Sequence, residues 1–300
     1  LYPFRPDFYG AMGFGYGPKL NTYRFAPDAL PARGDKTRAR FLEDGDHTAV
    51  VALHNTVAAR THGMIALAPT AAATYLTQPD QRLVGWFDAQ GALRGYLAFS
   101  FDLPDKQRNF LLQDLIVHAL IYADSEALLG LLAFLRAQRD QFRAVIVHTL
   151  LDGFQYLLTD PRNGPEAPTP NVYHESNTQG VGLMYRLIDV KRFFAALPDH
   201  HFGAETLTLR LKLRDSFLPE QDGSVTVRFE RGVAHVEAGR TRAEVELTLA
   251  VGDASALLMG CVSLRTLYEF GLVEVSDVGQ VSRLDALIRV ERPPVCLTAF

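Results

Sequence analysis

The chain is poor in cysteine and in long apolar runs, and each shortage excludes a class of protein. Only Cys261 and Cys296 occur among 300 residues, which excludes a disulfide framework and favours a reducing compartment such as the cytoplasm. We expect both thiols to behave as small buried apolar groups. No apolar run approaches the roughly 20 residues that a membrane-spanning helix needs, so we expect no membrane partner.

The chain also has no excess of positive charge and no metal-ligand spacing. The formal net charge is −4 and no basic stripe stands out, so we expect no nucleic-acid partner. Nine histidines are present, but none has a spacing typical of a metal site. We expect the pairs His54/His62 and His200/His201 to be surface or hydrogen-bonded core residues, and no metal to be bound.

What is present is ordinary globular material, with 48% hydrophobic and 21% charged residues. Three hundred residues suffice for two domains and part of a third. The opening stretch predicts a strand end at 1–4 and a short helix at 6–12, with Pro6 in its first turn and Gly13 in the left-handed position after it. Such a unit cannot bury an apolar face alone. Because the chain also begins with Leu1 rather than Met, we expect it to be a truncated piece of a longer protein.

The middle of the chain predicts alternating helices and strands after a charged, glycine-interrupted linker at 33–40. The expected elements are a helix capped by Asp46 or Thr48, a helix at 71–76, a hairpin at 83–88 and 93–102, a strand at 110–122, a helix capped by Ser125, a strand at 144–149, a helix near 154–157 and a strand at 183–190.

The last hundred residues show a clean two-residue periodicity after a hinge at 198–203. Apolar residues alternate with polar ones in three runs: Leu207, Leu209, Leu211 and Leu213; Val225, Val227 and Phe229; Val245, Leu247 and Leu249. This pattern predicts an antiparallel meander with one apolar face. Asp253, Ser263 and Asp277 are expected to cap three helices that cover it, which makes an α+β layer.

The opening residues resemble a known family. The run Phe8-Tyr9-x-x-Met12-Gly13-Phe14 resembles the closing helix and strand of a GNAT-type N-acetyltransferase domain. Leu-Tyr-Pro-Phe-Arg-x-x-Phe-Tyr followed by Gly-Phe-Gly-Tyr-Gly-Pro resembles one branch, the bacterial Eis-like (enhanced intracellular survival) acetyltransferases.

That resemblance implies an α+β fold class in three parts. These are the truncated end of a catalytic GNAT domain at 1–33, a second GNAT-like domain without a CoA site at 34–198, and a sterol-carrier-protein-like domain at 199–300. It also implies acetyl-CoA as the acetyl donor, a small-molecule amine as the acceptor and a hexameric assembly.

The junction at 123–130 departs from the GNAT pattern. In a working domain this strand–helix junction has the form Arg/Gln-x-x-Gly-x-Gly/Ala, and its backbone N–H groups hold the CoA pyrophosphate. Here Asp124 and Glu126 occupy the place of an anion, and no glycine allows close backbone approach. We interpret both carboxylates as partners of the helix dipole and predict that this region binds no CoA. The acetyl-CoA cradle is expected upstream of Leu1.

The resemblance also assigns the catalytic residues. Tyr9 would be the general acid, and the α-carboxylate of Phe300 would be threaded into the first domain's active site as base or relay; Phe8 is a candidate contact for the cofactor. From the helix alone, Tyr9 would be interpreted as an aromatic on the buried side of its helix. The tail, with two prolines at 293 and 294 and apolar residues after them, could be a buried strand or a frayed end.

The chemistry sets conditions on these roles. An amine with a pKa of about 10.4 must lose a proton, and a leaving thiolate with a pKa of about 8.5 must gain one. Donation from a phenol with a pKa of about 10 is uphill by only about 2 kcal/mol. A carboxylate with a pKa of about 3.5 is a weak base unless burial raises it, which suits an apolar tail.

Two functions from different classes follow from the sequence. The first is an N-acetyltransferase acting on amines such as aminoglycosides, polyamines or lysine-type amines, present here as a fragment that we expect to be inactive. The alternative is a sterol-carrier-like module that binds an apolar ligand without catalysis. The three glycines at 13, 15 and 17 do not form a nucleotide fingerprint, because they lead into a strand rather than a helix.

Overall fold

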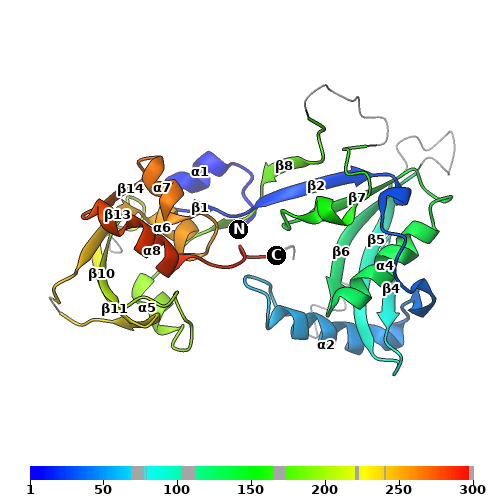
Figure 1. Cartoon of the computed structure of the whole chain (residues 1–300), viewed down its shortest axis with the longest axis horizontal. Helices are drawn as coiled ribbons and strands as arrows, with labels where there is room; N and C mark the ends of the chain where they lie inside the picture. The colour runs from blue at the N-terminus through cyan, green and yellow to red at the C-terminus, as the bar shows by residue number, and fades with distance from the viewer. Residues whose placement is uncertain are drawn as a thin grey trace. The chain divides into compact units, whose positions relative to one another are not determined.

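The computed structural model describes residues 1–68, 78, 80–102, 113–164, 173–219, 223–239 and 241–296. They fall into two compact units. The terminal unit joins Leu1–Pro18 to Val181–Pro294, and the middle unit consists of Lys19–Gly180 with Val295–Phe300. Figure 1 shows the elements of each unit, from blue at the N-terminus to red at the C-terminus.

A seven-stranded sheet forms the centre of the middle unit, in the order β3-β4-β5-β6-β7-β2-β8. Its strands are β2 Lys19–Phe25, β3 Ala39–Phe41, β4 Arg82–Phe87, β5 Leu93–Asp102, β6 Asp114–Tyr122, β7 Ala144–Thr149 and β8 Thr178–Val181. β6 and β7 are parallel, and helix α4 (Ser125–Ala137) connects them, as a parallel pair requires. The β2–β7, β3–β4, β4–β5 and β5–β6 pairs are antiparallel.

Two helices cover opposite faces of this sheet. Alternate residues of β5 show this, since they enter two different cores. Tyr96 and Ala98 pack with helix α2 (His47–Ala58), whereas Leu97 and Phe99 pack with α4. Successive side chains of a strand point to opposite faces, so a strand covered on both sides is apolar throughout. The predicted hairpin, the strand at 144–149 and the helix after residue 124 are confirmed. The helix predicted at 71–76 lies outside the described residues.

The terminal unit contains a five-stranded sheet in the order β12-β11-β10-β13-β14. Its strands are β10 Leu207–Arg214, β11 Gly223–Glu230, β12 Val233–Val236, β13 Val245–Ala250 and β14 Val273–Val275. Its helices are α1 Pro6–Ala11, α5 Val190–Ala195, α6 Val251–Leu258, α7 Leu264–Glu269 and α8 Val281–Ile288, and a short ribbon pairs β1 Gly15–Tyr16 with β9 Met184–Tyr185. The alternating leucines of β10 all enter one core with α6, α7 and α8, which confirms the single apolar face.

The prediction of an antiparallel meander is wrong for one pair of strands. β10 and β11 are antiparallel, as are β11 and β12, but β13 runs parallel to β10 on its other edge. Alternation of apolar residues fixes which face of a strand is buried, and it says nothing about which strand lies beside it. The connection after β12 is long enough to carry the chain past β11 to the free edge of β10.

Several predicted element ends also need correction. Residues 1–4 do not form a strand, although the N–H and C=O groups of Leu1 bond to Met184. The strand predicted at 183–190 is limited to β9, and a short 3₁₀ turn replaces the helix expected near residue 154. Asp253 lies inside the first turn of α6 rather than at its cap. Ser263 caps α7 as predicted, accepting a hydrogen bond from the N–H of Thr266.

Candidate functional site

Helix α1 presents the predicted catalytic tyrosine within a small aromatic cluster. Pro6 occupies its first turn, and the N–H of Met12 bonds to the carbonyl of Tyr9 at 3.0 Å. The helix ends at Ala11, and the φ of 79° at Gly13, just after the C-cap Met12, confirms the predicted left-handed position. A residue with a Cβ would be strained there.

The Tyr9 ring is half-buried and makes edge contacts with three phenylalanines. Its centroid lies 5.4 Å from that of Phe4, 5.3 Å from Phe8 and 5.8 Å from Phe14. Such edge-to-face pairs hold a ring in one orientation. Phe8 is itself 43% exposed and Phe4 73% exposed, so both could contact a further molecule. The cluster therefore fixes the tyrosine ring and leaves part of its surroundings open.

The second predicted catalytic group, the carboxylate of Phe300, lies outside the described residues. The last described part of the tail is fixed within the middle unit, where the N–H of Val295 donates to the carbonyl of His62 at 2.8 Å. Cys296 follows with 4% exposure, as expected for a small buried apolar group.

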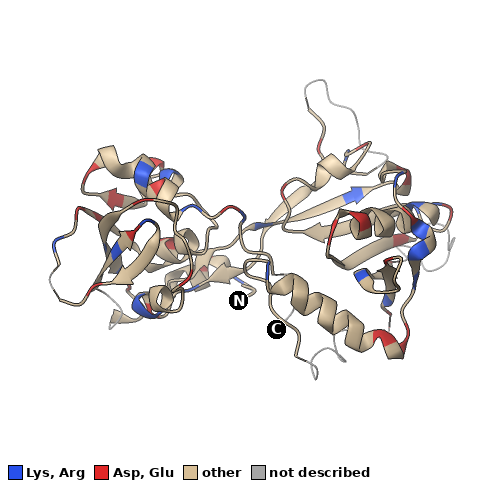
Figure 2. Cartoon of the chain, turned by 60° about the horizontal axis from the view of Figure 1, so that its bottom comes forward, with Lys and Arg blue, Asp and Glu red and all other residues tan. Residues whose placement is uncertain are grey.

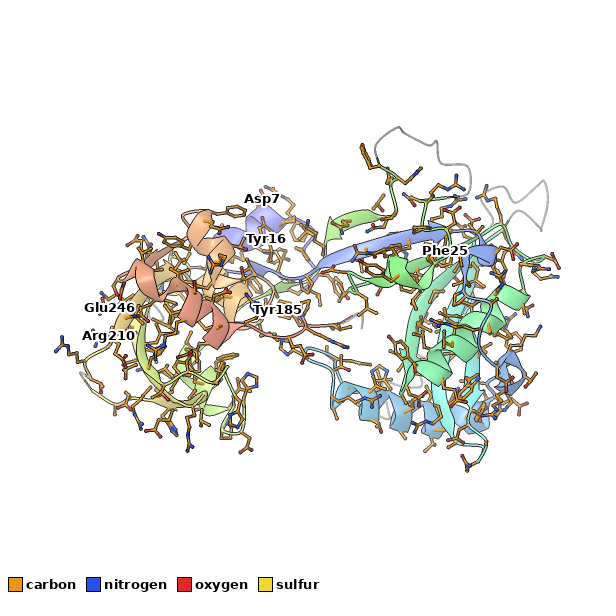
Figure 3. The ribbon with its side chains drawn as sticks, viewed as in Figure 1. Asp7, Tyr16, Phe25, Tyr185, Arg210 and Glu246 are labelled. Carbon is orange, nitrogen blue, oxygen red and sulfur yellow. The ribbon has the colours of Figure 1, made fainter. Side chains whose placement is uncertain are left out.

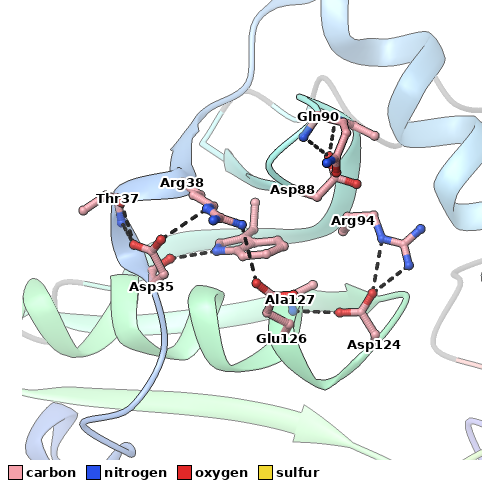
Figure 4. A network of polar contacts seen from close by, with 11 residues as sticks. Asp35, Thr37, Arg38, Asp88, Gln90, Arg94, Asp124, Glu126 and Ala127 are labelled. Carbon is pink, nitrogen blue, oxygen red and sulfur yellow. Dashed lines mark hydrogen bonds and ion pairs between the residues drawn. The ribbon is translucent and has the colours of Figure 1, made fainter.

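The strand–helix junction at 123–130 is occupied by its own acidic side chains. Asp124, rather than the predicted Ser125, caps α4, and its Oδ1 accepts the N–H of Ala127 at 2.9 Å. Its Oδ2 accepts two hydrogen bonds from the guanidinium of Arg94, at 2.7 and 3.2 Å. Figure 4 shows these contacts, with Glu126 reaching Arg38 at 3.5 Å. A carboxylate already fills the place where an anion would meet the helix N-terminus.

The charge on Asp124 is stabilised despite partial burial. Burial alone raises the pKa of this carboxyl, but the N–H of Ala127 and the Arg94 guanidinium outweigh it, so the pKa lies below its ordinary value. The one glycine of residues 123–130 is Gly130, which lies inside α4 and allows close packing. A Cβ there would lie 2.0 Å from Nε1 of Trp86, whose N–H donates to the carbonyl of Asp35 at 2.7 Å.

The histidines behave as core and surface residues. His54 is 2% exposed, and its Nε2 lies 3.0 Å from the carbonyl of Ile65 and its Nδ1 2.8 Å from the hydroxyl of Tyr96. The carbonyl can only accept, so Nε2 carries the proton and Tyr96 donates to Nδ1. Burial lowers the pKa of His54. No group of three or more metal-ligating side chains occurs among the described residues.

Two cavities of the terminal unit bear on ligand binding. The larger, of about 840 Å³, lies on the outer face of the five-stranded sheet and is lined by charged side chains that include Lys191, Arg210 and Lys212. Arg210 is also paired with Glu246 of β13 at 2.9 Å, and both residues are labelled in Figure 3. The other, beside Leu257 and Cys261, has a volume of about 160 Å³. A ligand pocket typically has a volume of about 300–1,000 Å³ and an apolar lining. The larger cavity has the volume but a charged lining, and the smaller one is below this volume.

One contact that fixes the end of α1 could not be predicted from the sequence. Arg186, which follows β9, donates to the carbonyl of Met12 at the end of α1 and to Asp215 at 2.7 Å. The two charged side chains are 29 residues apart in the chain and sit in no recognisable motif.

Comparison with known proteins identifies two domains. Residues 66–187 match the family model of the acetyltransferase (GNAT) domain, and residues 190–297 match that of the sterol carrier protein domain. The predicted α+β fold class, which joins a GNAT domain to a sterol-carrier-like domain, is thereby confirmed. No curated protein matches the chain in sequence. Among the described residues, no helix has the length and apolar character to cross a membrane.

Solved structures share the fold over the whole chain. A conserved protein from Enterococcus faecalis V583, described as a probable N-acyltransferase, has a TM-score of 0.77 at 17% identity, covering 100% of this chain and 71% of that one. A GCN5-related N-acetyltransferase from Anabaena variabilis gives 0.77 at 17% identity, covering 100% and 72%. Eis1 from Mycobacterium abscessus gives 0.73 at 17% identity, covering 100% and 73%.

Proposed function

We propose that this chain is part of a bacterial, Eis-like N-acetyltransferase that transfers the acetyl group of acetyl-CoA to a small-molecule amine. The observation that carries the proposal is the match of residues 66–187 to the GNAT family. Solved N-acetyltransferases that share the fold over the whole chain support it. We further propose a hexameric, cytoplasmic enzyme, on the strength of the Eis-like opening motif.

The proposed reaction uses one acid and one base. The base takes a proton from the ammonium group, and the resulting amine attacks the thioester carbonyl. The carbon–sulfur bond then breaks, and the leaving thiolate takes its proton from the hydroxyl of Tyr9. The α-carboxylate of Phe300 is the proposed base or relay, and Phe8 is the proposed contact for the cofactor. The products are the N-acetylated amine and the free thiol of CoA.

We place the acetyl-CoA site away from the junction at 123–130. Asp124 already satisfies the N–H of Ala127 and carries a charge that would repel a pyrophosphate. The solved structures extend beyond the part that matches this chain, so we propose that the cofactor cradle belongs to a segment outside residues 1–300. A crystal soaked with CoA that held it at 123–130 would contradict this.

The sterol-carrier-like domain gives no support to the alternative of an apolar-ligand carrier. The larger cavity of the terminal unit is lined by charged side chains, and the smaller one has about half the volume that small ligands usually need. We therefore assign that domain a supporting role in the enzyme.

The sharpest test is the Tyr9→Phe variant of the full-length enzyme, with Tyr16→Phe as its matched control. Loss of a general acid should lower kcat by about 10²–10⁴-fold while KM for acetyl-CoA changes little. Tyr16 is 55% exposed on β1 in the same unit, so its variant should keep kcat within about twofold. Unchanged turnover by the Tyr9→Phe variant would show that Tyr9 is not the general acid. Addition of one residue after Phe300 tests the carboxylate in the same assay and should abolish turnover.

A further inference from the structure

Gly15, which follows α1, is explained by close contact with helix α6 of the sterol-carrier-like part of the terminal unit. A Cβ at Gly15 would lie 2.0 Å from the carbonyl oxygen of Gly252 on α6. Gly252 in turn lies under the backbone of Phe14, where its own Cβ would be 3.2 Å from the carbonyl oxygen. Ser255, on the same helix, accepts the N–H of Leu187 at 2.9 Å just after β9. Helix α6 therefore supports both strands of the β1–β9 ribbon, and β1 leads directly from α1 (Figure 1).

A buried ion pair fixes the end of α1 itself. The side chains of Arg186 and Asp215 are 4% and 1% exposed, and their nitrogen and oxygen atoms lie 2.7 Å apart. The other Nη of Arg186 donates to the carbonyl of Met12, which is one of the carbonyls that a helix end leaves without an intrahelical donor. The remaining oxygen of Asp215 accepts the N–H groups of Leu218 and Phe217 at 2.9 and 3.1 Å.

The cost of burying this pair indicates a geometric role. A buried ion pair is on average no more stabilising than apolar residues of the same size, but loss of one partner leaves an uncompensated charge. The pair fixes the orientation of the α1 end, because the planar guanidinium bonds the carboxylate and the Met12 carbonyl at the same time. Met12 follows Tyr9 by three residues, and its N–H bonds to the Tyr9 carbonyl. The pair therefore holds the helical turn that carries the tyrosine ring.

We propose that Arg186 and Asp215 are positioning residues for Tyr9, and that the sterol-carrier-like domain is the mount on which the catalytic helix is held. This inference rests on the proposed function for the role of Tyr9. Displacement of a catalytic group by about 1 Å can lower a rate about 10²-fold, so the mount affects turnover without touching either substrate.

The test compares variants of the full-length enzyme in two measurements, hydrogen exchange of residues 6–14 and steady-state kinetics. Arg186→Gln removes the charge, and Arg186→Lys keeps the charge but loses the planar fork. Gly252→Ala changes no charge, and it favours helix formation in α6 while it pushes the Phe14 backbone by a few tenths of an ångström. Arg214→Gln is the control, because Arg214 pairs with Glu274 on the exposed sheet face of the same unit.

We expect Arg186→Gln to raise exchange of residues 6–14 at least about tenfold and to lower kcat about 10–100-fold, with KM within about threefold. Arg186→Lys should recover part of the loss. Gly252→Ala should lower kcat without lowering Tm, which a purely structural role would not produce. Arg214→Gln should leave exchange and kinetics unchanged. In the Tyr9→Phe background, Arg186→Gln should cause little further loss of kcat, because both changes act through one group.

If hydrogen exchange of residues 6–14 is unchanged in Arg186→Gln, the proposal that Arg186 holds α1 in place is wrong. Multiplicative losses of kcat in the double variant would also overturn it, since Arg186 would then act apart from Tyr9. Suppose that Tyr9→Phe keeps full turnover while Arg186→Gln still raises hydrogen exchange of residues 6–14. Tyr9 is then not the general acid, but the proposal that Arg186 holds α1 in place is supported.

Discussion

Asp46 occupies the N-cap position of α2, as predicted, but its side chain bonds to Arg40 and to the N–H of Glu43 rather than to an N–H of that helix. Both of its carboxylate oxygens accept hydrogen bonds from the Arg40 guanidinium, at 2.7 and 2.8 Å, and one also accepts the N–H of Glu43 at 2.9 Å. Figure 2 shows the acidic residues at this end of an otherwise uncharged helix. The bond from Arg40 is the largest cause that lowers the pKa of Asp46 to about 2.

This shift predicts an acid-dependent loss of stability. The folded pKa of about 2 lies below the ordinary value of about 3.9, so the stabilisation is present above about pH 4 and is lost as the pH falls toward 2. Because Arg40 is half-exposed, we expect Asp46→Asn to cost only about 1 kcal/mol at pH 7 and close to nothing at pH 2. Urea unfolding at both pH values measures the difference.

Asp7→Asn is the control for that measurement. Asp7 pairs with Arg5 at the exposed surface, and we expect Asp7→Asn to cause no measurable change in the free energy of unfolding at either pH. A cost of Asp46→Asn that is the same at pH 7 and pH 2 would contradict the assigned ionisation.

Other single residues follow their expected environments. His54 is a hydrogen-bonded core residue, as predicted, and Cys296 is buried. Cys261 is only partly buried, unlike the prediction, but burial still raises the pKa of its thiol to about 12, which makes it an inert group at neutral pH. These outcomes could be predicted because a lone histidine or cysteine in an apolar neighbourhood is more often packed than reactive.

At the level of elements, the N-terminus of α4 combines a cap and an ion pair in one carboxylate. The acidic residues there were predicted from the sequence to serve the helix rather than a cofactor. The bond from Asp124 to the Ala127 N–H agrees with that interpretation. The pairing with Arg94 on β5 could not be predicted, since it depends on which strand lies beside the helix start.

Two substitutions separate these contributions. Asp124→Ala should destabilise the chain by about 1–2 kcal/mol, because both the cap and the ion pair are lost. Asp124→Asn keeps an oxygen for the Ala127 N–H and should cost only a few tenths of a kcal/mol, since Arg94 is 44% exposed. Glu126→Gln, at an exposed side chain, serves as the control in urea unfolding. An Asn variant as unstable as the Ala variant would assign the stability to the ion pair instead of the cap.

At the scale of the whole molecule, the first eighteen residues share a unit with Val181–Pro294. The β1–β9 pairing and the Leu1–Met184 hydrogen bonds account for this. The domain boundaries predicted near residues 33 and 198 remain predictions, as does the assignment of 34–198 to a GNAT-like domain without a CoA site.

The Eis-like proposal makes one prediction about assembly. Size-exclusion chromatography with light scattering should give six times the chain mass for the full-length protein at micromolar concentration. The same measurement on Arg214→Gln is a control for nonspecific charge effects and should give the same mass. A monomer in both samples would contradict the Eis-like assignment while leaving the GNAT domain intact.

The sequence by itself determined the type of most elements, the buried faces of β10, β11 and β13, the short helix that begins at Pro6 and the α+β layer of the last hundred residues. These follow from local propensity and periodicity, which a short window of residues contains. Only the tertiary structure decided that β13 runs parallel to β10, that Arg94 meets Asp124, and that Arg186 and Asp215 hold Met12. Each of these depends on partners about thirty or more residues away, and no local pattern encodes which distant backbone or charge will come to lie beside a given side chain.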